Sequence, residues 1–371
     1  MIYFSVPADF DIGTLERMHH LNKIYDDCRI KEVYGQITIG DIQSSGRLTD
    51  VLPQVDRYKI EQYVNQAANF GVEFNYTLNP SCFGNQEFSE VGIEQINILL
   101  NNIWNMGIRN LTLVSPALIE ISIATGLKFN IKASTICEIN TPLKADFYKK
   151  LGVKRLVVDA DITRCFVKLR DICKSFGEGV EIIANNVCRR NCAYKMFHYN
   201  HEAHCTSQST QTIKDYFANR CSMQNTKDAE TLMKLNWIRP EDLHFYESCG
   251  IKNFKIQGRQ NILACDLIKT VQSYFERNYD GNLYDLITLF YPYDAYQHYI
   301  DNKKLNGFLD KFYEDPNFCR DLCGECRYCL KYANSCVDNK KEERITSMAK
   351  RVFEKYDKFA QTLRDINIEN K

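Results

Sequence analysis

Strand-like and helix-like segments alternate from the amino terminus to about residue 275, and this alternation limits the possible folds more than any other feature. Most of the strand-like segments are separated by stretches of helical length in which apolar residues recur three and four positions apart. A chain that alternates in this way forms a parallel sheet covered by helices. Eight segments have the length and composition of strands: residues 2–6, 32–37, 72–78, 110–115, 128–134, 155–160, 180–185 and 253–258.

Three junctions repeat one local pattern: MGIRNLTLV (106–114), LGVKRLVVD (151–159) and CGIKNFKIQ (249–257). In each, a glycine ends a helix, a basic residue follows and an apolar strand begins. Glycine favours the left-handed backbone conformation that often closes a helix. Eight βα units joined in this way predict a (β/α)8 barrel of the TIM type. An open, doubly wound sheet is the alternative, but no glycine-rich phosphate-binding sequence follows an early strand to support it.

Two segments depart from the alternation. Residues 187–237 separate the seventh strand from the next helix, and a connection of this length in a compact domain is usually functional. Beyond residue 275 the sequence is rich in Tyr and Phe, then in Cys, and it ends in an amphipathic segment of helical length. We therefore expect a barrel of residues 1–275 that includes the 187–237 insertion, followed by a helical, cysteine-rich extension of residues 276–371. We expect the terminal helix to pack on the barrel.

Sixteen cysteines among 371 residues are the most unusual feature of the composition. The amino terminus lacks the basic segment of a secretory signal, and no apolar stretch approaches the roughly 18 residues of a membrane span. We therefore expect a cytoplasmic protein in an anaerobic setting, because cysteine clusters in a reducing compartment bind metals or take part in redox chemistry. The net charge is zero, with 47 basic and 47 acidic residues, so charge gives no general argument for a nucleic-acid partner.

The first cysteine cluster lies in NNVCRRNCAYKMFHYNHEAHC, residues 185–205, where the seventh strand should open onto the barrel mouth. Cys188, Cys192, Cys205 and the more distant Cys221 supply four thiolates, the number that a 4Fe-4S cluster takes. Zinc is the competing metal, but this loop lacks the paired CxxC sequences of structural zinc sites. Three histidines are possible substitutes for a thiolate or, alternatively, possible activators of a nucleophilic cysteine: His198, His201 and His204.

The second cysteine cluster lies in CRDLCGECRYCLKYANSC, residues 319–336. Its first three cysteines match the CxxxCxxC spacing by which radical enzymes hold a cluster against S-adenosylmethionine. The position near the carboxyl end and the fourth cysteine argue against that chemistry. We expect a closed second cluster, structural or electron-relaying, with zinc as the alternative. The expected ligands are Cys319, Cys323, Cys326 and Cys329, with Cys336 as a substitute.

Four stretches together resemble peptidase family U32, the collagenase-like peptidases. They are EVYGQ with SSGRLTDVLP (32–53), the 185–205 segment, NWIRPEDLHFYESCGIKNFKIQGR (236–259) and CGECRYC (323–329). The resemblance implies a barrel that carries a four-cysteine 4Fe-4S cluster. Despite the peptidase name, the better understood relatives look like oxygen-independent hydroxylation proteins. Those relatives act on tRNA, ribosomal RNA or the ubiquinone ring, some of them with prephenate as the oxygen donor.

Carried over by position, the resemblance implies Cys188 and Cys192 as cluster ligands. Cys205 and Cys221 complete the set, and Cys137, just past the fifth strand, is the main substitute.

Lys255 and Arg259 correspond to the basic residues of the family's Lys-Ile-Glu-Gly-Arg strand. The resemblance implies that they face the barrel mouth and bind an anionic donor or a phosphate, although a structural salt bridge is an alternative for Arg259. An amide cannot shuttle protons at neutral pH, so the loss of two carboxylates removes the obvious general acid and base. The departures from the family pattern are Asn186 for Glu, Ala193 for Pro, Lys195 for Arg and Gln257 for Glu.

Three functional hypotheses follow. The leading one is a cluster-dependent, oxygen-independent modification of an RNA, peptide or small-molecule substrate by a redox step of the hydroxylation type. The second is a metal-dependent hydrolase or peptidase, which a redox-silent zinc would favour. The third is a non-catalytic, cluster-binding partner of an active homologous protein. The candidate catalytic residues are Lys255, Arg259 and His198.

Overall fold

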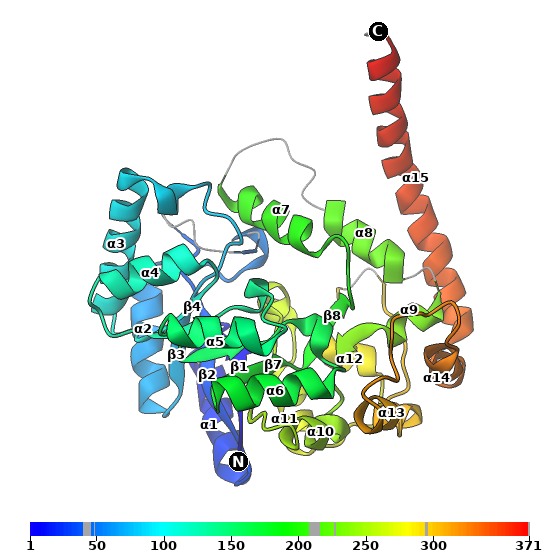
Figure 1. Cartoon of the computed structure of the whole chain (residues 1–371), viewed down its shortest axis with the longest axis horizontal. Helices are drawn as coiled ribbons and strands as arrows, with labels where there is room; N and C mark the ends of the chain where they lie inside the picture. The colour runs from blue at the N-terminus through cyan, green and yellow to red at the C-terminus, as the bar shows by residue number, and fades with distance from the viewer. Residues whose placement is uncertain (40–45, 48, 208–215, 226–227, 294–295, 370–371) are drawn as a thin grey trace.

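The computed structural model describes residues 1–39, 46–47, 49–207, 216–225, 228–293 and 296–369 (Figure 1). Its centre is a closed barrel of eight parallel strands in the order β1, β10, β7, β6, β5, β4, β3, β2. Each of the eight predicted strand segments overlaps one of these strands, although β2 begins four residues before the predicted segment, so the predicted (β/α)8 barrel is confirmed. The strands are β1 (Ile2–Pro7), β2 (Cys28–Gly35), β3 (Glu73–Leu78), β4 (Asn110–Leu113), β5 (Asn130–Ala133), β6 (Arg155–Val157), β7 (Val180–Ile183) and β10 (Asn253–Lys255).

Helices connect these strands and surround the barrel (Figure 1). The three repeated junctions have the predicted backbone, because Gly107, Gly152 and Gly250 have φ values of 81°, 100° and 95°. A residue with a Cβ atom is strained in that region, which explains the glycine in each copy of the pattern. The helices are α1 (Ile12–Ile24), α2 (Arg57–Asn69), α3 (Glu90–Asn105), α4 (Pro116–Ala124), α5 (Pro142–Lys150), α6 (Phe166–Phe176), α10 (Leu243–Glu247) and α11 (Leu267–Phe275).

The insertion after β7 begins and ends in a small antiparallel sheet, in which Asn185 of β8 pairs with Trp237 of β9. The chain therefore leaves the barrel and returns to it at nearly the same point. In Figure 1, α7 and α8 lie across the end of the barrel away from the N-terminus, which is the end where the parallel strands finish. The insertion consists of β8 (Asn185–Arg189), α7 (Lys195–Ser207), α8 (Tyr216–Asn225), α9 (Ala229–Met233) and β9 (Leu235–Trp237).

The carboxyl-terminal extension packs beside the insertion. The start of its last helix is fastened by a buried ion pair, in which Nδ1 of His298 lies 2.8 Å from Oε2 of Glu342. Ile345 and Ala349 of the same helix pack against Tyr296. Beyond these contacts the helix extends away from the rest of the chain (Figure 1). The helices of the extension are α12 (Leu283–Ile287), α13 (Asp310–Glu314), α14 (Tyr328–Cys336) and α15 (Asn339–Glu369).

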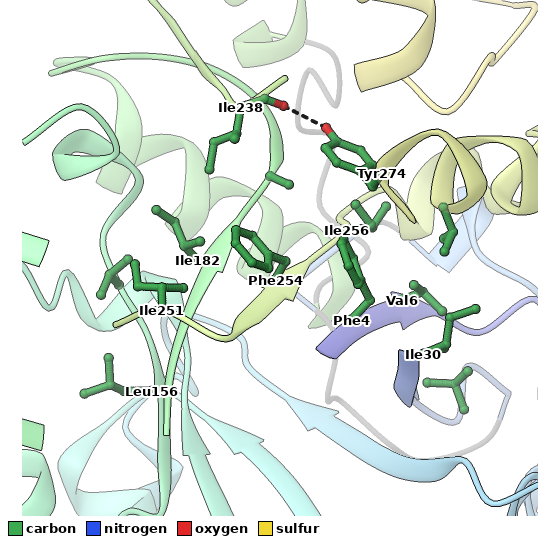
Figure 2. Close-up of a cluster of buried hydrophobic side chains, with 14 of the residues drawn as sticks. Phe4, Val6, Ile30, Leu156, Ile182, Ile238, Ile251, Phe254, Ile256 and Tyr274 are labelled. Carbon is green, nitrogen blue, oxygen red and sulfur yellow. Dashed lines mark hydrogen bonds between the residues drawn. The ribbon is translucent and has the colours of Figure 1, made fainter. Parts of the chain in front are cut away.

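Apolar side chains on the outer faces of the strands form the core between the barrel and its helices. Figure 2 shows the part beside β1 and β10, where the rings of Phe4 and Phe254 stack with centroids 5.6 Å apart. Tyr274 of α11 packs on Phe4, and its hydroxyl donates a 2.9 Å hydrogen bond to the carbonyl oxygen of Ile238. Across the described part of the chain, no helix combines the length and the apolar character needed to cross a membrane.

Candidate functional site

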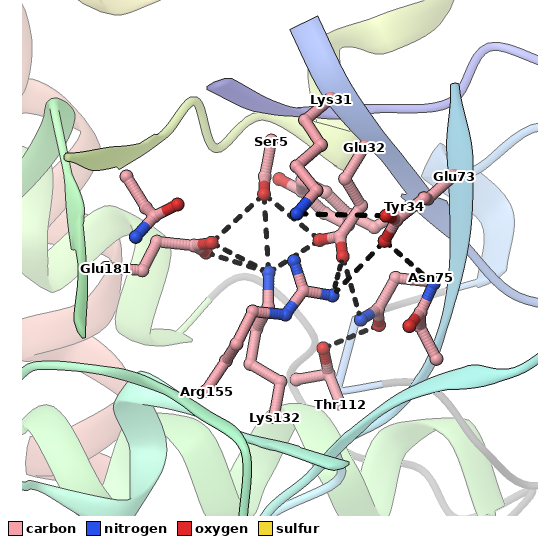
Figure 3. A network of polar contacts seen from close by, with 12 residues as sticks. Ser5, Lys31, Glu32, Tyr34, Glu73, Asn75, Thr112, Lys132, Arg155 and Glu181 are labelled. Atoms are coloured by element: carbon pink, nitrogen blue, oxygen red, sulfur yellow. Dashed lines mark hydrogen bonds and ion pairs between the residues drawn. The ribbon is translucent and has the colours of Figure 1, made fainter. Parts of the chain in front are cut away.

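A layer of charged side chains fills the inside of the barrel (Figure 3). Lys132 is completely buried, and its Nζ lies 2.5 Å from Oε1 of Glu32 and 2.8 Å from Oε2 of Glu181. Arg155 pairs with the other carboxylate oxygen of Glu32. The Ser5 hydroxyl lies 3.0 Å from an oxygen of each carboxylate and can donate its single proton to either one. Two acids thus balance two bases in a space that TIM barrels usually fill with Val, Ile and Leu.

The bases of this layer keep the carboxylate of Glu32 ionised. Burial acts to raise the pKa of Glu32, but Arg155, Lys132 and Lys255 together hold that pKa below its usual range. The sequence analysis missed the layer, although a signal was present. Polar residues such as Glu32 and Glu181 alternate with apolar residues inside strands that are otherwise buried.

Lys255, the last residue of β10, lies beside the charged layer. Its ammonium group sits over the ring of Tyr34, 3.5 Å from the ring centroid, and part of the side chain remains accessible. Burial, reinforced by the positive charge of Lys132, lowers the pKa of Lys255 to about 7. At neutral pH this amine is therefore divided between its charged and neutral forms, which is unusual for lysine.

Arg259 is also buried, and it donates to two neutral amide oxygens. Its Nη1 lies 2.5 Å from Oε1 of Gln36 and its Nη2 lies 3.3 Å from Oδ1 of Asn79. Arg259 therefore forms no salt bridge with any described residue, so its contacts do not support the alternative of a structural salt bridge. Burial, with a smaller effect of the nearby Arg47, lowers the pKa of Arg259 to about 10. Lys255 and Arg259 therefore bring two cationic side chains to the mouth, and neither forms an ion pair with a described carboxylate.

Three of the four predicted cluster ligands lie close enough to influence each other electrostatically. Burial raises the pKa of the Cys188 thiol to about 11, and the thiol of Cys192 raises it further while Arg47 opposes the rise. Burial raises the pKa of Cys221 in α8 to about 12, with further contributions from Cys188 and Cys192. Thiols of this kind stay protonated until a metal displaces the proton. Cys205 lies in α7, and its side chain is outside the described part of the structure.

Cys137, the substitute ligand, lies in a different environment. Its thiol donates to the carbonyl oxygen of Val114 at 3.0 Å, and burial raises its pKa to about 11, an effect that a hydrogen bond with Tyr148 reduces. These contacts place Cys137 against the end of β4 and α5.

The helix α7 is held over the mouth by Lys195. Its Nζ lies 2.6 Å from Oδ2 of Asp161, 2.9 Å from Oδ1 of Asp159 and 3.3 Å from Oε1 of Glu138. The backbone N–H of Asn191 also donates to Asp161, at 3.0 Å. The carboxylates that follow β5 and β6 therefore serve to position the cysteine-bearing segment.

His198 lies on the face of α7 that contacts α8. Its ring stacks on Phe217 with centroids 5.4 Å apart, and its Nε2 lies 3.5 Å from Oε1 of Glu202. The spacing of four residues between His198 and Glu202 is the sequence signal for this pair, because residues four apart on a helix are neighbours.

Two positions where the family usually has Glu carry amides that orient the backbone. The Asn186 side chain accepts a 2.7 Å hydrogen bond from the backbone N–H of Cys188. The backbone N–H of Gln257 donates to Oδ1 of Asn185 at 2.7 Å, and the Gln257 side chain donates to the Asn185 carbonyl at 3.4 Å. These bonds fix the Cys188 segment to the end of β10.

The second cysteine cluster borders a pocket of about 200 Å³ between the insertion and the extension. We call it the C-terminal cysteine pocket. Cys336, the substitute ligand, is buried elsewhere, with its Sγ 3.9 Å from Sδ of Met233. Among the described residues, no three Cys, His, Asp or Glu side chains converge closely enough to hold a single metal ion. The four thiols that line the pocket belong to Cys319, Cys323, Cys326 and Cys329.

Comparisons with known proteins agree with the resemblance found in the sequence. The chain is 26% identical over 344 residues to the uncharacterized protease MJ1657 of Methanocaldococcus jannaschii, covering 91% of this chain and 99% of that protein. Among solved structures, it is similar to the U32 peptidase Mk0906, with 16% identity, a TM-score of 0.49 and coverage of 69% of this chain and 92% of the other. A tryptophan synthase from M. tuberculosis has 7% identity, a TM-score of 0.36 and coverage of 77% and 90%.

The model of peptidase family U32 matches residues 53–281, which is more than half of the chain and includes the first cysteine cluster, Lys255 and Arg259. The chain therefore belongs to peptidase family U32.

Proposed function

We propose that this chain is an iron–sulfur protein that carries out an oxygen-independent, hydroxylation-type modification of an RNA, peptide or small-molecule substrate at the barrel mouth. The observation that supports the proposal is that Cys188, Cys192 and Cys221 all belong to the insertion over the barrel mouth and that their thiols are near enough to act on one another electrostatically, although the described side chains do not converge on one point. With Cys205 as the fourth ligand, the donor set is the one that 4Fe-4S clusters use. A cluster held there supplies one-electron redox chemistry.

The basic residues of the mouth bind the anionic part of the substrate or of the oxygen donor. Arg259 is fixed by Gln36 and Asn79, so its guanidinium is already oriented before a ligand arrives. Lys255 has a pKa of about 7, and an anion beside it favours the charged form of the amine. Arg47 lies near both Arg259 and Cys188, which connects the anion site with the cysteines.

Hydrolysis is the second candidate function, and two observations favour it. The Methanocaldococcus jannaschii relative is named a protease, and His198 pairs with Glu202 on the helix that carries part of the cysteine cluster. A hydrolase needs an activated water or nucleophile. The nearest carboxylates after β5 and β6 are engaged by Lys195, which makes this candidate the weaker one.

The test compares Cys188→Ala with Cys137→Ala after strictly anaerobic purification. We expect Cys188→Ala to lose about four iron and four sulfide per chain, and Cys137→Ala to keep the wild-type content. Loss of iron in Cys137→Ala but not in Cys188→Ala would mean that Cys137, and not Cys188, is a ligand of the cluster. Zinc without sulfide, together with cleavage of a protein substrate that a chelator abolishes, would establish the hydrolase instead.

A second experiment tests the reaction. RNA and small metabolites from an anaerobically grown deletion strain are compared by mass spectrometry with those of strains complemented by wild type or Cys188→Ala. We expect at least one product that carries an added oxygen atom in the wild type and is absent from the other two strains. If all three strains have the same oxygenated products, the modification hypothesis is wrong.

A further inference from the structure

The C-terminal cysteine pocket has the size of a cluster site. Zinc–sulfur bonds of about 2.3 Å would require the four sulfur atoms of a zinc site to lie within roughly 4 Å of one another. The described thiols do not converge in that way. They border a hollow of about 200 Å³ instead. An iron–sulfur cluster places several iron and sulfide atoms between its ligands and therefore needs such a space.

A buried cation, Arg164, lies behind one wall of this pocket, where its guanidinium sits over the rings of Trp237, Phe308 and the pocket-lining Phe312 and forms no ion pair with a described carboxylate. Arg164 is 5% exposed, and its Nη groups donate to the carbonyl oxygens of Met233 and Leu235. Its Nε has no hydrogen-bond partner in the part of the chain that the structure describes. The thiols of Cys329 and Cys319 lie near enough to act on Arg164 electrostatically. As metal-bound thiolates they would supply the negative charge that this buried arginine lacks.

A second arginine reaches the same pocket from the mouth of the barrel. Arg190 lies between Cys188 and Cys192 in the sequence, and its Nη1 donates to Sγ of Cys319 at 3.3 Å. Its Nη2 lies 3.6 Å from the half-exposed carboxylate of Asp321, and its buried Nε is also without a partner among the described residues. Arg164 and Arg190 thus lie behind the pocket, each with an Nε–H group that has no partner among the described residues, while the lining itself includes the carboxylates of Glu230, Asp321 and Glu325.

We propose that the C-terminal cysteine pocket holds a second, anionic 4Fe-4S cluster whose charge is balanced by Arg164 and Arg190. Four thiolates give such a centre a net negative charge, which both guanidinium groups stabilise. Arg190 acts as a positioning residue, because it touches a ligand sulfur and also belongs to the segment that carries Cys188 and Cys192. The proposal goes beyond the function proposed for the mouth and does not depend on it.

The first part of the test measures metal content in the full-length chain. Cys326→Ala and Cys188→Ala are purified anaerobically, alone and combined, and iron, zinc and sulfide are counted. We expect Cys188→Ala to keep about four iron and four sulfide, and the double variant to have neither. This result is expected even if the mouth binds no cluster. Failure of the proposed cluster at the mouth can therefore be distinguished from failure of the proposed cluster in the C-terminal cysteine pocket. Zinc without sulfide in Cys188→Ala, or unchanged metal in Cys326→Ala relative to wild type, would overturn the second cluster.

The second part tests Arg190 by the reduction potential of the remaining cluster in the Cys188→Ala protein, followed by electron paramagnetic resonance. Removing a positive charge and an N–H···S hydrogen bond makes reduction harder. We expect Arg190→Gln to lower the reduction equilibrium constant about tenfold, which for one electron is about 59 mV. Arg320→Gln is the matched control, because Arg320 lines the same pocket but is exposed and screened by water.

Arg190→Lys completes the series because it keeps the charge and loses the planar fork of donors. We expect a potential between those of Arg190→Gln and the parent. If Arg190→Gln loses the cluster, retention of the cluster in Arg190→Lys supports the same role. Equal potentials in Arg190→Gln and Arg320→Gln would contradict charge balancing by Arg190, and so would equal cluster loss in Arg190→Gln and Arg190→Lys.

Discussion

The inside of the barrel and its mouth use charged residues in opposite ways. Inside, Glu32 and Glu181 are matched by Lys132 and Arg155, and the hydroxyl of Ser5 completes the network. Every charge there has a partner of opposite sign, so the layer has no need of a ligand. Such a closed network holds the strands together and gives them one arrangement.

At the mouth the balance is missing. Among the described residues, Arg259 donates to neutral oxygens, and Lys255 lies over the ring of Tyr34, where burial and the repulsion of Lys132 outweigh the more distant attraction of Glu181 and Glu32. The matched charges inside the barrel therefore stabilise the fold, whereas the unmatched charges at the mouth are suited to bind an anion. Perturbed groups of this kind are concentrated at functional sites.

The largest expected effect comes from breaking the closed layer with Glu32→Gln. The substitution leaves Lys132 and Arg155 to share the single charge of Glu181 in a buried space. We expect the free energy of unfolding to fall by about 3–5 kcal/mol, the range found when one partner of a buried ion pair is removed. Urea denaturation followed by circular dichroism measures it. A loss below about 1 kcal/mol would show that the layer is not closed in the way described.

A smaller effect is expected at the boundary between the layer and the mouth. Lys195→Met leaves Asp159 and Asp161 without the ammonium group that holds them 2.9 and 2.6 Å away. We expect a loss of about 1–3 kcal/mol, because these carboxylates are partly buried and would face each other unpaired. The same denaturation measurement applies, with Lys150→Met as control, since Lys150 is 77% exposed in its pair with Asp146. Equal effects of the two substitutions would contradict the anchoring role of Lys195.

A substitution at the mouth should change the free energy of unfolding in the opposite direction. Removing the charge of Lys255 should stabilise the protein, because this charge has no ion-pair partner among the described residues. The folded pKa of Lys255, about 7, lies below that of an unfolded lysine, about 10.4. Between these values the unfolded chain binds more protons, so stability rises with pH across that window. We expect Lys255→Met to be more stable than wild type by on the order of 1 kcal/mol at pH 6, with the difference shrinking toward pH 10.

Thermal unfolding at several pH values checks this expectation. A variant that is less stable than wild type at pH 6 would mean that the lysine is favourably paired in the folded protein.

The smallest effect is expected at the surface below the layer. Lys31 lies 3.8 Å from Glu73, and the two side chains are 43% and 44% exposed. We expect Lys31→Met to change the free energy of unfolding by less than about 1 kcal/mol, and less still in high salt. A loss as large as that of Glu32→Gln would remove the distinction between buried and exposed charges on which the comparison rests.

The sequence by itself determined the barrel, because short-range signals specify it. Strand-like segments, helical periodicity and the glycines at 107, 152 and 250 all depend on neighbouring residues, and the structure has the predicted strands and the predicted glycine backbone. The family was also predictable, since it rests on residues close together in the chain. The cluster ligands, by contrast, stay predictions.

Only the tertiary structure decided which charges are matched. Ser5 and Glu181 are 176 residues apart in the chain, and Arg190 and Cys319 are 129 apart, yet both pairs are in contact. No local pattern encodes such pairs, because they arise when the closed barrel brings side chains of β1 and β7 together in its interior and when the extension returns to the insertion. The pKa of Lys255 depends on these neighbours in the same way, and so does the assignment of Arg164 and Arg190 to the C-terminal cysteine pocket.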